Sequence, residues 1–301
     1  RKAVGERATL TADRDDGRGP VCWQGILAGA RLLHETAERA LYRASLVPKL
    51  WVLQQYVRSY VHTKKKIDAY VGDTLKDGGL TGGDFDFKTN TGAYPQEEFV
   101  CQYRESHLDF VHRWFEREGI YYYFEHGEGA GATEKMVIVD DKAQHGPLLG
   151  DGHVRYYAGA GADGSAGECL RELSADFRLL PASVHVSDYN YANPAAPLTG
   201  EKAVTSGGQG KIREYGYRVF TEGEARRLAQ VKAQSIAWRE LVLQASGTYL
   251  GLRAGYTFEV EEGPSDLPTK YLAIEVKHAG AVSGAAPLVM RYTGLDPKET
   301  Y

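Results

Sequence analysis

Alternating hydrophobic and polar residues run through both ends of the chain. Residues 21–33 and 41–48 predict two longer strands, and the charged, glycine-bearing residues 13–20 predict a hairpin tip before them. Near the other end, residues 256–261 alternate between apolar and polar side chains. In residues 272–277 the branched side chains Leu272, Ile274 and Val276 alternate with Ala273, Glu275 and Lys277, and the apolar or branched face of each segment is expected to be buried. A period of two residues places alternate side chains on one face of a strand. Both ends of the chain therefore predict small antiparallel sheets.

The period changes in the middle of the chain, where residues 99–126 predict a strand, a helix and a second strand. Ser106 is a candidate N-cap, and Asp109, three residues later, is placed to complete an acidic capping box. Apolar residues recur through residues 108–115 at helical spacing. Gly119 supplies the left-handed conformation that ends a helix. The polar side chains of this unit are expected to be caps and surface pairs.

Two further segments have helical spacing. Residues 63–78 carry an apolar stripe that two glycines end, and three lysines occupy the expected first turn, where the helix dipole disfavours positive charge. A solvated basic face is the favoured interpretation of these lysines, and contact with an acidic partner is the alternative. The second helix is expected at residues 221–239, where Thr221 and Glu224 form a capping box.

These patterns predict an α+β fold that is mostly antiparallel β, with two small β-barrel domains and a mixed α/β lobe between them. The expected boundaries are 1–56 for the first barrel, 57–157 for the lobe and 158–301 for the second barrel with one helix. Residues 158–167 are rich in glycine and alanine, which predicts a connector. Residues 81–95 are expected to be a polar loop.

Composition narrows the possible functions. The 301 residues carry a formal net charge of −4, which argues against a general binder of nucleic acids or anionic membranes. Three cysteines, far apart in sequence, form neither a disulfide framework nor a zinc spacing. No run approaches the ~18 apolar residues that span a bilayer, so stable membrane insertion is not expected. The first residues lack both an initiator methionine and a signal peptide, so we expect a fragment that was made in the cytoplasm.

A search for chemical motifs yields partial matches only. Residues 34–38 resemble the zinc motif HExxH, but glutamate stands where the second histidine is needed. Residues 207–211 resemble the end of a phosphate-binding loop, but they lack its first glycine and its hydroxyl residue. Adjacent carboxylates such as Asp140 and Asp141 point to opposite faces of a strand, so they cannot act together as acid and base. We therefore expect no catalytic residue, no metal site and no cofactor.

The stretch of residues 102–126 resembles the signature of VgrG proteins, the spike-tip trimers of type VI secretion systems. His107 departs from the family pattern, which usually has an acidic residue there. The positions that match, read as a structural signature, are Gln102, Tyr103, Arg104, Glu105, Ser106, Asp109, Phe110, Arg113, Glu118, Gly119, Ile120, Tyr121 and Tyr122.

The resemblance implies a module similar to the baseplate hub of contractile phage tails. Such a hub is a homotrimer that adapts a three-fold spike to the six-fold tube of Hcp-like protein, and it carries spike-tip or effector proteins. It is assembled in the secretion apparatus and delivered without a cleaved signal peptide, and it is not an enzyme. Subunit contacts are expected near residues 21–33 and 256–261. The alternatives are a prophage tail hub and, in a different class, a polysaccharide hydrolase.

Overall fold

The computed structural model describes residues 3–14, 19–37, 40–129, 131–158, 167–191 and 193–280. Most of the predicted connector at 158–167 lies outside these ranges. The chain divides into two compact units, each described here by itself. The first holds the chain up to Trp114 together with Tyr121–Gly146, and the second holds Phe115–Ile120 together with the chain from Pro147 onward.

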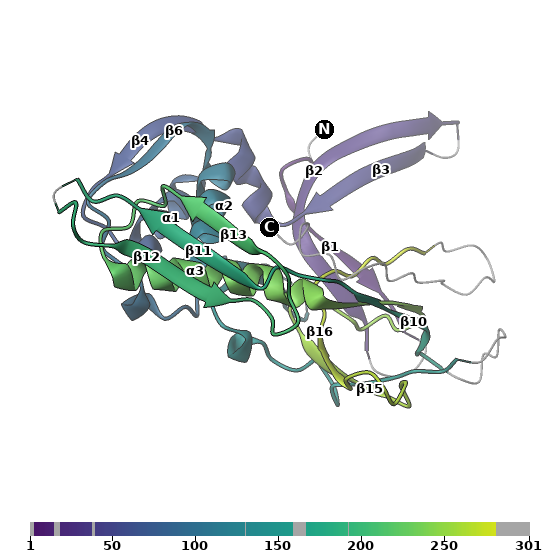
Figure 1. Cartoon of the computed structure of the whole chain (residues 1–301). Coiled ribbons are helices and arrows are strands. Elements are labelled where there is room, and N and C mark those ends of the chain that lie inside the picture. The colour runs from purple at the N-terminus through teal and green to yellow at the C-terminus, as the bar shows by residue number, and fades with distance from the viewer. Residues whose placement is uncertain are drawn as a thin grey trace. The chain divides into compact units, whose positions relative to one another are not determined.

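The first unit begins with an antiparallel sheet in the order β1-β2-β3. Its strands are β1 (Arg7–Ala12), β2 (Val21–Glu35) and β3 (Ala40–Val47), which confirms the predicted pair of longer strands. β1 pairs only with the first six residues of β2, up to Ile26. Beyond that point β2 pairs with β3 alone, and the two strands form the hairpin that extends past β1 in Figure 1. We call this part of the hairpin the arm.

The rest of the first unit is the α/β lobe. A two-stranded ribbon pairs β4 with β6, and a three-stranded sheet has the order β5-β8-β7. The predicted strand–helix–strand unit is confirmed, with its two strands in different sheets. The elements are, in chain order, η1 (Lys49–Gln55), β4 (Val57–His62), α1 (Ile67–Asp77), β5 (Phe85–Phe87), η2 (Thr91–Ala93), β6 (Val100–Ser106), α2 (His107–Glu118), β7 (Tyr121–His126), β8 (Glu134–Val139) and η3 (Lys142–Gln144).

An aromatic cluster forms the core of the lobe. Tyr70 of α1 lies edge-on to Phe110 and Trp114 of α2, with ring centroids 6.1 and 5.1 Å apart. His62 of β4 stacks on Phe110 at 5.9 Å and is buried with no hydrogen bond to either ring nitrogen. Burial lowers the pKa of His62, so its ring packs as a neutral aromatic group. The predicted apolar stripe of α1 supplies the other side of this core.

Two predictions for the lobe are wrong. The lysines do not occupy the first turn of a helix, because α1 begins at Ile67 with Lys66 as N-cap, and its first turn carries Asp68. The expected loop at residues 81–95 contains the three-residue strand β5, which pairs in parallel with β8. A strand of three residues is too short to show a period, so local patterning could not reveal it.

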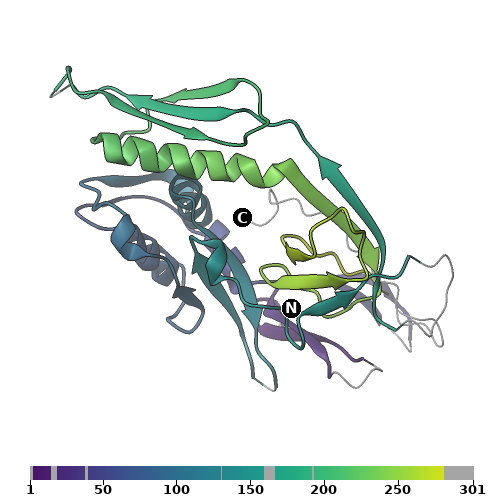
Figure 2. The same cartoon turned by 60° about the horizontal axis from the view of Figure 1, so that its bottom comes forward.

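The second unit combines a helix with several small sheets. α3 (Glu222–Ala237) covers one face of the sheet β12-β11-β13, and Figure 2 shows the helix lying along that sheet. Thr221 and Glu224 form the predicted capping box. The remaining elements are β9 (His153–Arg155), β10 (Leu170–Phe177), β11 (Ser183–Asp188), β12 (Leu198–Ala203), β13 (Lys211–Tyr215), η5 (Trp238–Glu240), β14 (Leu241–Gly247), β15 (Thr257–Glu261) and β16 (Lys270–Leu272).

The strand predicted at residues 272–277 is wrong in extent and in phase. β16 ends at Leu272, and the fully buried side chain beyond it is Ala273, not a branched one. Ala273 exchanges backbone hydrogen bonds with Gly255 and Tyr256, which brings it against the sheet. Alternation gives a period, but it does not say which face is buried when both faces carry apolar residues.

The fold is α+β and mostly antiparallel, as predicted, with parallel pairing of β11 with β13, of β9 with β15 and of β5 with β8. Each sheet of the described residues is an open sheet of two or three strands. The two closed barrels and the three-part domain division remain predictions.

Candidate functional site

The signature segment begins with a buried polar network that holds β6 to both helices. Gln102 is fully buried, and its Nε2 donates to the Glu105 carbonyl at 3.0 Å and to His107 Nδ1 at 3.0 Å. With Nδ1 accepting, His107 Nε2–H donates to Asp77 Oδ2 at 2.8 Å, and Asp77 also pairs with Arg58 at 2.7 Å. His107 is 1% exposed, so it is not the surface group that we expected. Burial lowers its pKa, more than Asp77 raises it.

The start of α2 is capped as the sequence predicts. Ser106 Oγ accepts from the Asp109 amide at 3.0 Å, which satisfies one of the free donors of the first turn. The Ser106 hydroxyl in turn donates to Asp109 Oδ2 at 2.7 Å, so the carboxylate meets the hydroxyl and not the backbone amide of a standard capping box. Arg113, two turns into the helix, pairs with Glu105 at 2.6 Å and donates to the Cys101 carbonyl at 3.1 Å.

The end of α2 belongs to the second unit and packs against α3. The buried Glu118 pairs with Arg117, and with Arg227 of α3 at 2.6 Å. Gly119 has a φ of +73°, and a Cβ there would lie 2.7 Å from Val231 Cγ1. Glycine is therefore required both by backbone conformation and by the close approach of α3. Ile120, the next residue, is buried.

The two signature tyrosines that follow both contact histidines. Tyr121 lies 3.0 Å from His145 Nε2, and burial raises the pKa of Tyr121 to about 12. Tyr122 lies 2.9 Å from His112 Nε2, and burial raises its pKa as well. His107 and His112 have separate partners, so the structure does not bring them together as ligands. Both phenols stay protonated at neutral pH and anchor β7.

Tyr103 and Arg104 of the signature face solvent at the bulge of β6. Tyr103 is 65% exposed, and Arg104 beside it has a φ of +49°, a conformation that costs a non-glycine residue about 1 kcal/mol or more. The register of β4 with β6 shifts here, so that Tyr103 and Arg104 lie opposite Ser59 alone. This is a β-bulge, which re-aims side chains. The Arg104 guanidinium lies 5.3 Å from the Tyr103 ring centre.

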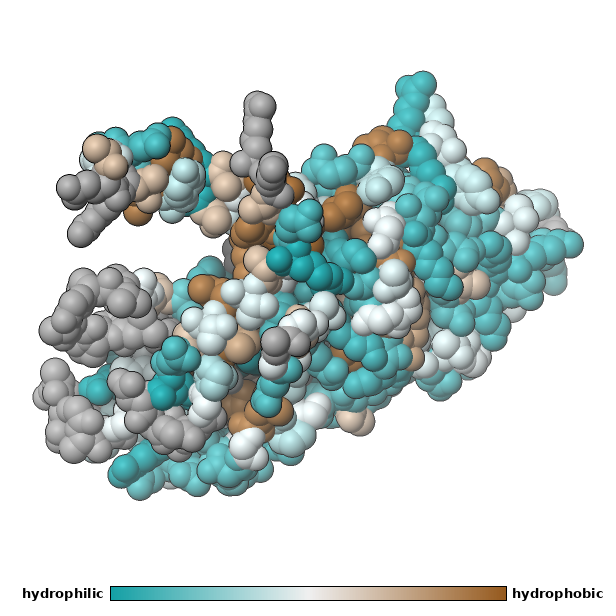
Figure 3. All heavy atoms as spheres, turned by 180° about the vertical axis from the view of Figure 1, so that it is seen from behind, coloured by the Kyte–Doolittle hydropathy of each residue, from teal (hydrophilic) through white to brown (hydrophobic). Residues whose placement is uncertain are grey.

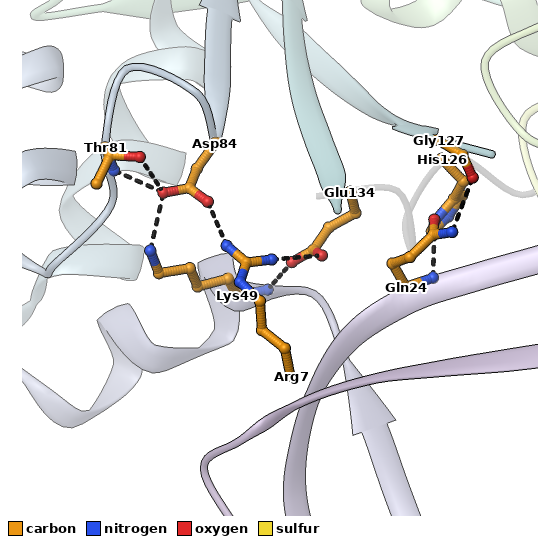
Figure 4. Close-up of polar contacts among 8 residues, drawn as sticks. All are labelled: Arg7, Gln24, Lys49, Thr81, Asp84, His126, Gly127 and Glu134. Atoms are coloured by element: carbon orange, nitrogen blue, oxygen red, sulfur yellow. Dashed lines mark hydrogen bonds and ion pairs between the residues drawn. The ribbon is translucent and has the colours of Figure 1, made fainter. Parts of the chain in front are cut away.

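A cluster of charged side chains joins the first sheet to the lobe (Figure 4). Arg7 of β1 pairs with Asp84 at 2.6 Å and with Glu134 at 3.2 Å. Lys49 contributes Nζ to Asp84 at 2.8 Å and its backbone amide to Glu134 at 2.8 Å. The two carboxylates are only 6% and 3% exposed. Burial alone would raise the pKa of Asp84, but bonds from Lys49 and from Thr81 outweigh it and lower this pKa to about 2.

A second polar contact supports the same junction. Gln24 of β2 donates from its backbone amide to His126 Nδ1 at 3.1 Å and from its side chain to the Gly127 carbonyl at 2.8 Å. Figure 4 shows this contact beside the charge cluster. Our reading of the sequence missed both sets, because Arg7 and Glu134 lie 127 positions apart and Gln24 and His126 lie 102 apart. No local pattern could have indicated them.

The arm is exposed on both faces. Every residue of β3 up to Ser45 is exposed, and so is most of β2 beyond Gly29. The large apolar side chains at its surface are Leu32, Leu33, Leu41 and Tyr42. Figure 3 shows hydrophobic and hydrophilic residues mixed along this hairpin. A two-stranded hairpin without a packed face is marginally stable in water, so this surface suits contact with another chain.

Neither a metal centre nor a membrane helix is evident in the parts of the chain that the structure describes. Those parts hold no group of three His, Cys, Asp or Glu residues that could hold a metal ion. His34 and Glu35 lie in a strand, not on the helix that the zinc motif needs. Within the same residues, no helix is long and apolar enough to cross a membrane.

Comparison with known proteins finds a matching family model and several spike proteins that resemble this chain. The family model for the phage tail baseplate hub (GPD) matches residues 1–284. The spike proteins VgrG1c and VgrG1b of the type VI secretion system of Pseudomonas aeruginosa are 24% identical over 265 residues and 23% identical over 283 residues. These alignments cover 85% and 91% of this chain but 34% and 37% of those proteins. The chain therefore spans about a third of their length.

Solved structures show the same fold. The E. coli c3393 protein, a type VI secretion component similar to the T4 tail proteins gp27 and gp5, matches with a TM-score of 0.64 at 15% identity. The match covers 93% of this chain and 62% of that one. The 43 kDa tail protein of prophage MuSo2 from Shewanella oneidensis matches with a TM-score of 0.55 at 11% identity, over 89% of this chain and 82% of that one. The resemblance to VgrG proteins is confirmed, and the chain belongs to the phage tail baseplate hub family.

Proposed function

We propose that this chain is the hub module of a spike in a contractile injection machine, most specifically of a type VI secretion system. The observation that carries the proposal is the family match over residues 1–284 together with VgrG spike relatives over most of the chain. In this role the chain works by shape and assembly. It adapts a three-fold spike to a six-fold tube and is expelled with that tube.

The module acts as a homotrimer that docks on an Hcp-like tube and carries spike-tip or effector proteins. Three copies of a two-barrel subunit present six similar barrels, and this arrangement requires barrels that close within the trimer. The exposed arm and the open sheets support this proposal, because both leave strands and apolar side chains uncovered. Subunit contacts involve residues 21–33 of β2 and the region of β15.

The module itself performs no reaction, and its signature residues act in structure. Ser106 caps a helix, Glu118 forms a buried ion pair, and several other signature residues are buried in the core, which supports this assignment. One relative is the actin cross-linking toxin VgrG1 of Vibrio cholerae, 22% identical over 79% of this chain but over 22% of that protein. A prophage tail hub is the second candidate, favoured by the MuSo2 fold match.

The test uses the full-length protein that carries this chain and the Hcp-like protein of the same genome. Light scattering measures the mass, and pull-down measures capture of the tube protein. We expect a trimer that binds the tube, and we expect Leu41→Glu in the arm to abolish both results. The matched control is Tyr191→Glu, which changes an exposed side chain of the second unit and leaves both results intact. A folded trimer that captures no tube protein would overturn the proposal.

A further inference from the structure

The ribbon of β4 and β6 has an apolar outer face. Val61 of β4 lies opposite Cys101 of β6. Because side chains alternate along a strand, Val57 shares the face of Val61, and Phe99 and Tyr103 share the face of Cys101. All four of these side chains are exposed, by 42% to 65%. On the inner face His62, Val100 and Gln102 are buried, and Tyr60, opposite Gln102, is 48% exposed. The ribbon therefore uses one face for the core and leaves the other uncovered.

The ribbon also has a free edge. Among the described residues, β4 pairs with β6 alone, so the opposite edge of β4 offers unpaired backbone groups. The outer edge of β6 is partly covered, because Arg113 donates to the Cys101 carbonyl. A free edge beside an apolar face is the arrangement to which an extended peptide adds as a further strand.

Two cations with positive φ lie beside this surface, one after the end of β4 and one opposite Ser59. Lys64 follows β4 with a φ of +52°, and Arg104 lies in the bulge of β6 with a φ of +49°. Both side chains are exposed, and neither forms an ion pair with any residue that the structure describes. The neighbouring Lys65, in contrast, is paired with Asp73 at 2.5 Å. The Arg104 amide donates to Ser59 Oγ at 3.2 Å and the Lys64 amide donates to the Glu98 carbonyl at 3.4 Å, so the fold holds both backbones while the two cationic side chains face solvent. Non-glycine residues held at positive φ concentrate at binding sites.

We propose that this outer face is a docking site for an extended, acidic segment of a different protein. The segment adds to the free edge of β4, lays apolar side chains over Val57, Val61 and Tyr103, and places carboxylates at Lys64 and Arg104. Six residues of β4 span roughly 20 Å, so the matching segment has about five residues between its acidic pairs. Tyrosine and arginine, which the bulge presents together, are the residues that most often dominate binding energy.

The test uses the whole chain and a fluorescein-labelled peptide, Glu-Glu-Leu-Thr-Phe-Thr-Leu-Glu-Glu, in fluorescence anisotropy. Three peptides are compared: this one, its counterpart with lysine at all four glutamates, and a version N-methylated at two adjacent central residues. We expect the lysine peptide to bind at least tenfold more weakly, because its charges repel Lys64 and Arg104. The N-methylated peptide should bind equally poorly, because it cannot form the strand ladder in either register.

Variants of the protein locate the site. Tyr103→Ser and Arg104→Gly are each expected to weaken binding about fivefold, and glycine at 104 also suits the positive φ, so this variant folds. The matched controls are Tyr42→Ser and Arg43→Gly, an exposed Tyr–Arg pair on β3 whose tyrosine is 61% exposed. Equal weakening by the controls, or equal binding of the lysine peptide, would overturn the proposal. Self-association of the chain that is lost in Tyr103→Ser would overturn it too, because the occupant would then be a second copy.

Discussion

The α/β lobe and the arm belong to the same unit, but they are held together in different ways. In the lobe, Tyr70, Phe110 and Trp114 meet in a buried aromatic cluster that both helices share. The described residues of the arm form no such cluster, because both faces of its two strands are exposed. Backbone pairing of β2 with β3 holds the arm, and the charge cluster of Arg7 and Lys49 attaches the first sheet, from which the arm extends, to the lobe. The difference shows that the lobe has its own buried core, and it is consistent with the proposal that the arm is covered by another subunit.

The largest expected effect tests the lobe core. Phe110→Ala should lower the free energy of unfolding by about 3–5 kcal/mol, because Phe110 is fully buried and its removal leaves a cavity between α1 and α2. Urea unfolding followed by circular dichroism measures the change. The control is Tyr42→Ala in the arm, expected to change the same free energy by less than about 0.5 kcal/mol. Equal losses in the two variants would show that the arm is packed as tightly as the lobe.

The next effect tests the charge cluster that joins the first sheet to the lobe. The pKa of Asp84 is about 2 in the fold against an ordinary 3.8, so the folded chain binds fewer protons than the unfolded chain between those pH values. Stability from this group is therefore present above pH 3.8 and is lost as pH falls through 2, by roughly 2 kcal/mol. Asp84→Asn should remove that part of the acid sensitivity and lower stability at pH 7, both measured by urea unfolding across pH.

The matched control for this prediction is Asp86→Asn. Asp86 lies two residues away and pairs with Lys135 at 3.3 Å, but both side chains are well exposed. Exposed ion pairs contribute about 0–1 kcal/mol, so this variant should leave the acid sensitivity nearly unchanged. If Asp86→Asn altered the acid transition as much as Asp84→Asn, the buried cluster would not be the source of this acid sensitivity.

A smaller effect tests the helix cap at the start of α2. Ser106→Ala should lower the stability of the lobe by about 1 kcal/mol, because the Asp109 amide loses its acceptor. Hydrogen exchange of the first turn of α2 gives a local measurement, and faster exchange is expected there than in α3. Ser106→Thr is the control, since threonine keeps the accepting oxygen. Unchanged stability in Ser106→Ala would contradict the cap.

Features that depend on near neighbours in sequence were predictable. The caps at Ser106 and Thr221 and the end of α2 at Gly119 are each set by a few adjacent residues, and the structure has all three. The ion pairs of Arg7 that attach the first sheet to the lobe were not predictable, because they join residues 77 and 127 positions apart. The bulge at Arg104 was equally hidden, since nothing in the local sequence indicates a positive φ at an arginine. Local chemistry thus revealed the elements, and only the fold revealed how the arm and the ribbon are displayed.

The smallest expected effect is the most informative about the arm. Leu41→Ser should change the free energy of unfolding of this chain by less than about 0.5 kcal/mol, because the side chain is 59% exposed and packs on no core. In the proposed trimer the same residue is expected to be covered, so Leu41→Ser in the full-length protein should raise the concentration at which subunits dissociate about tenfold, measured by analytical ultracentrifugation. An arm that served only the isolated chain would give the opposite pattern, with lost stability and unchanged assembly. The pair of measurements therefore separates a strand that folds for itself from one that is completed by its neighbour.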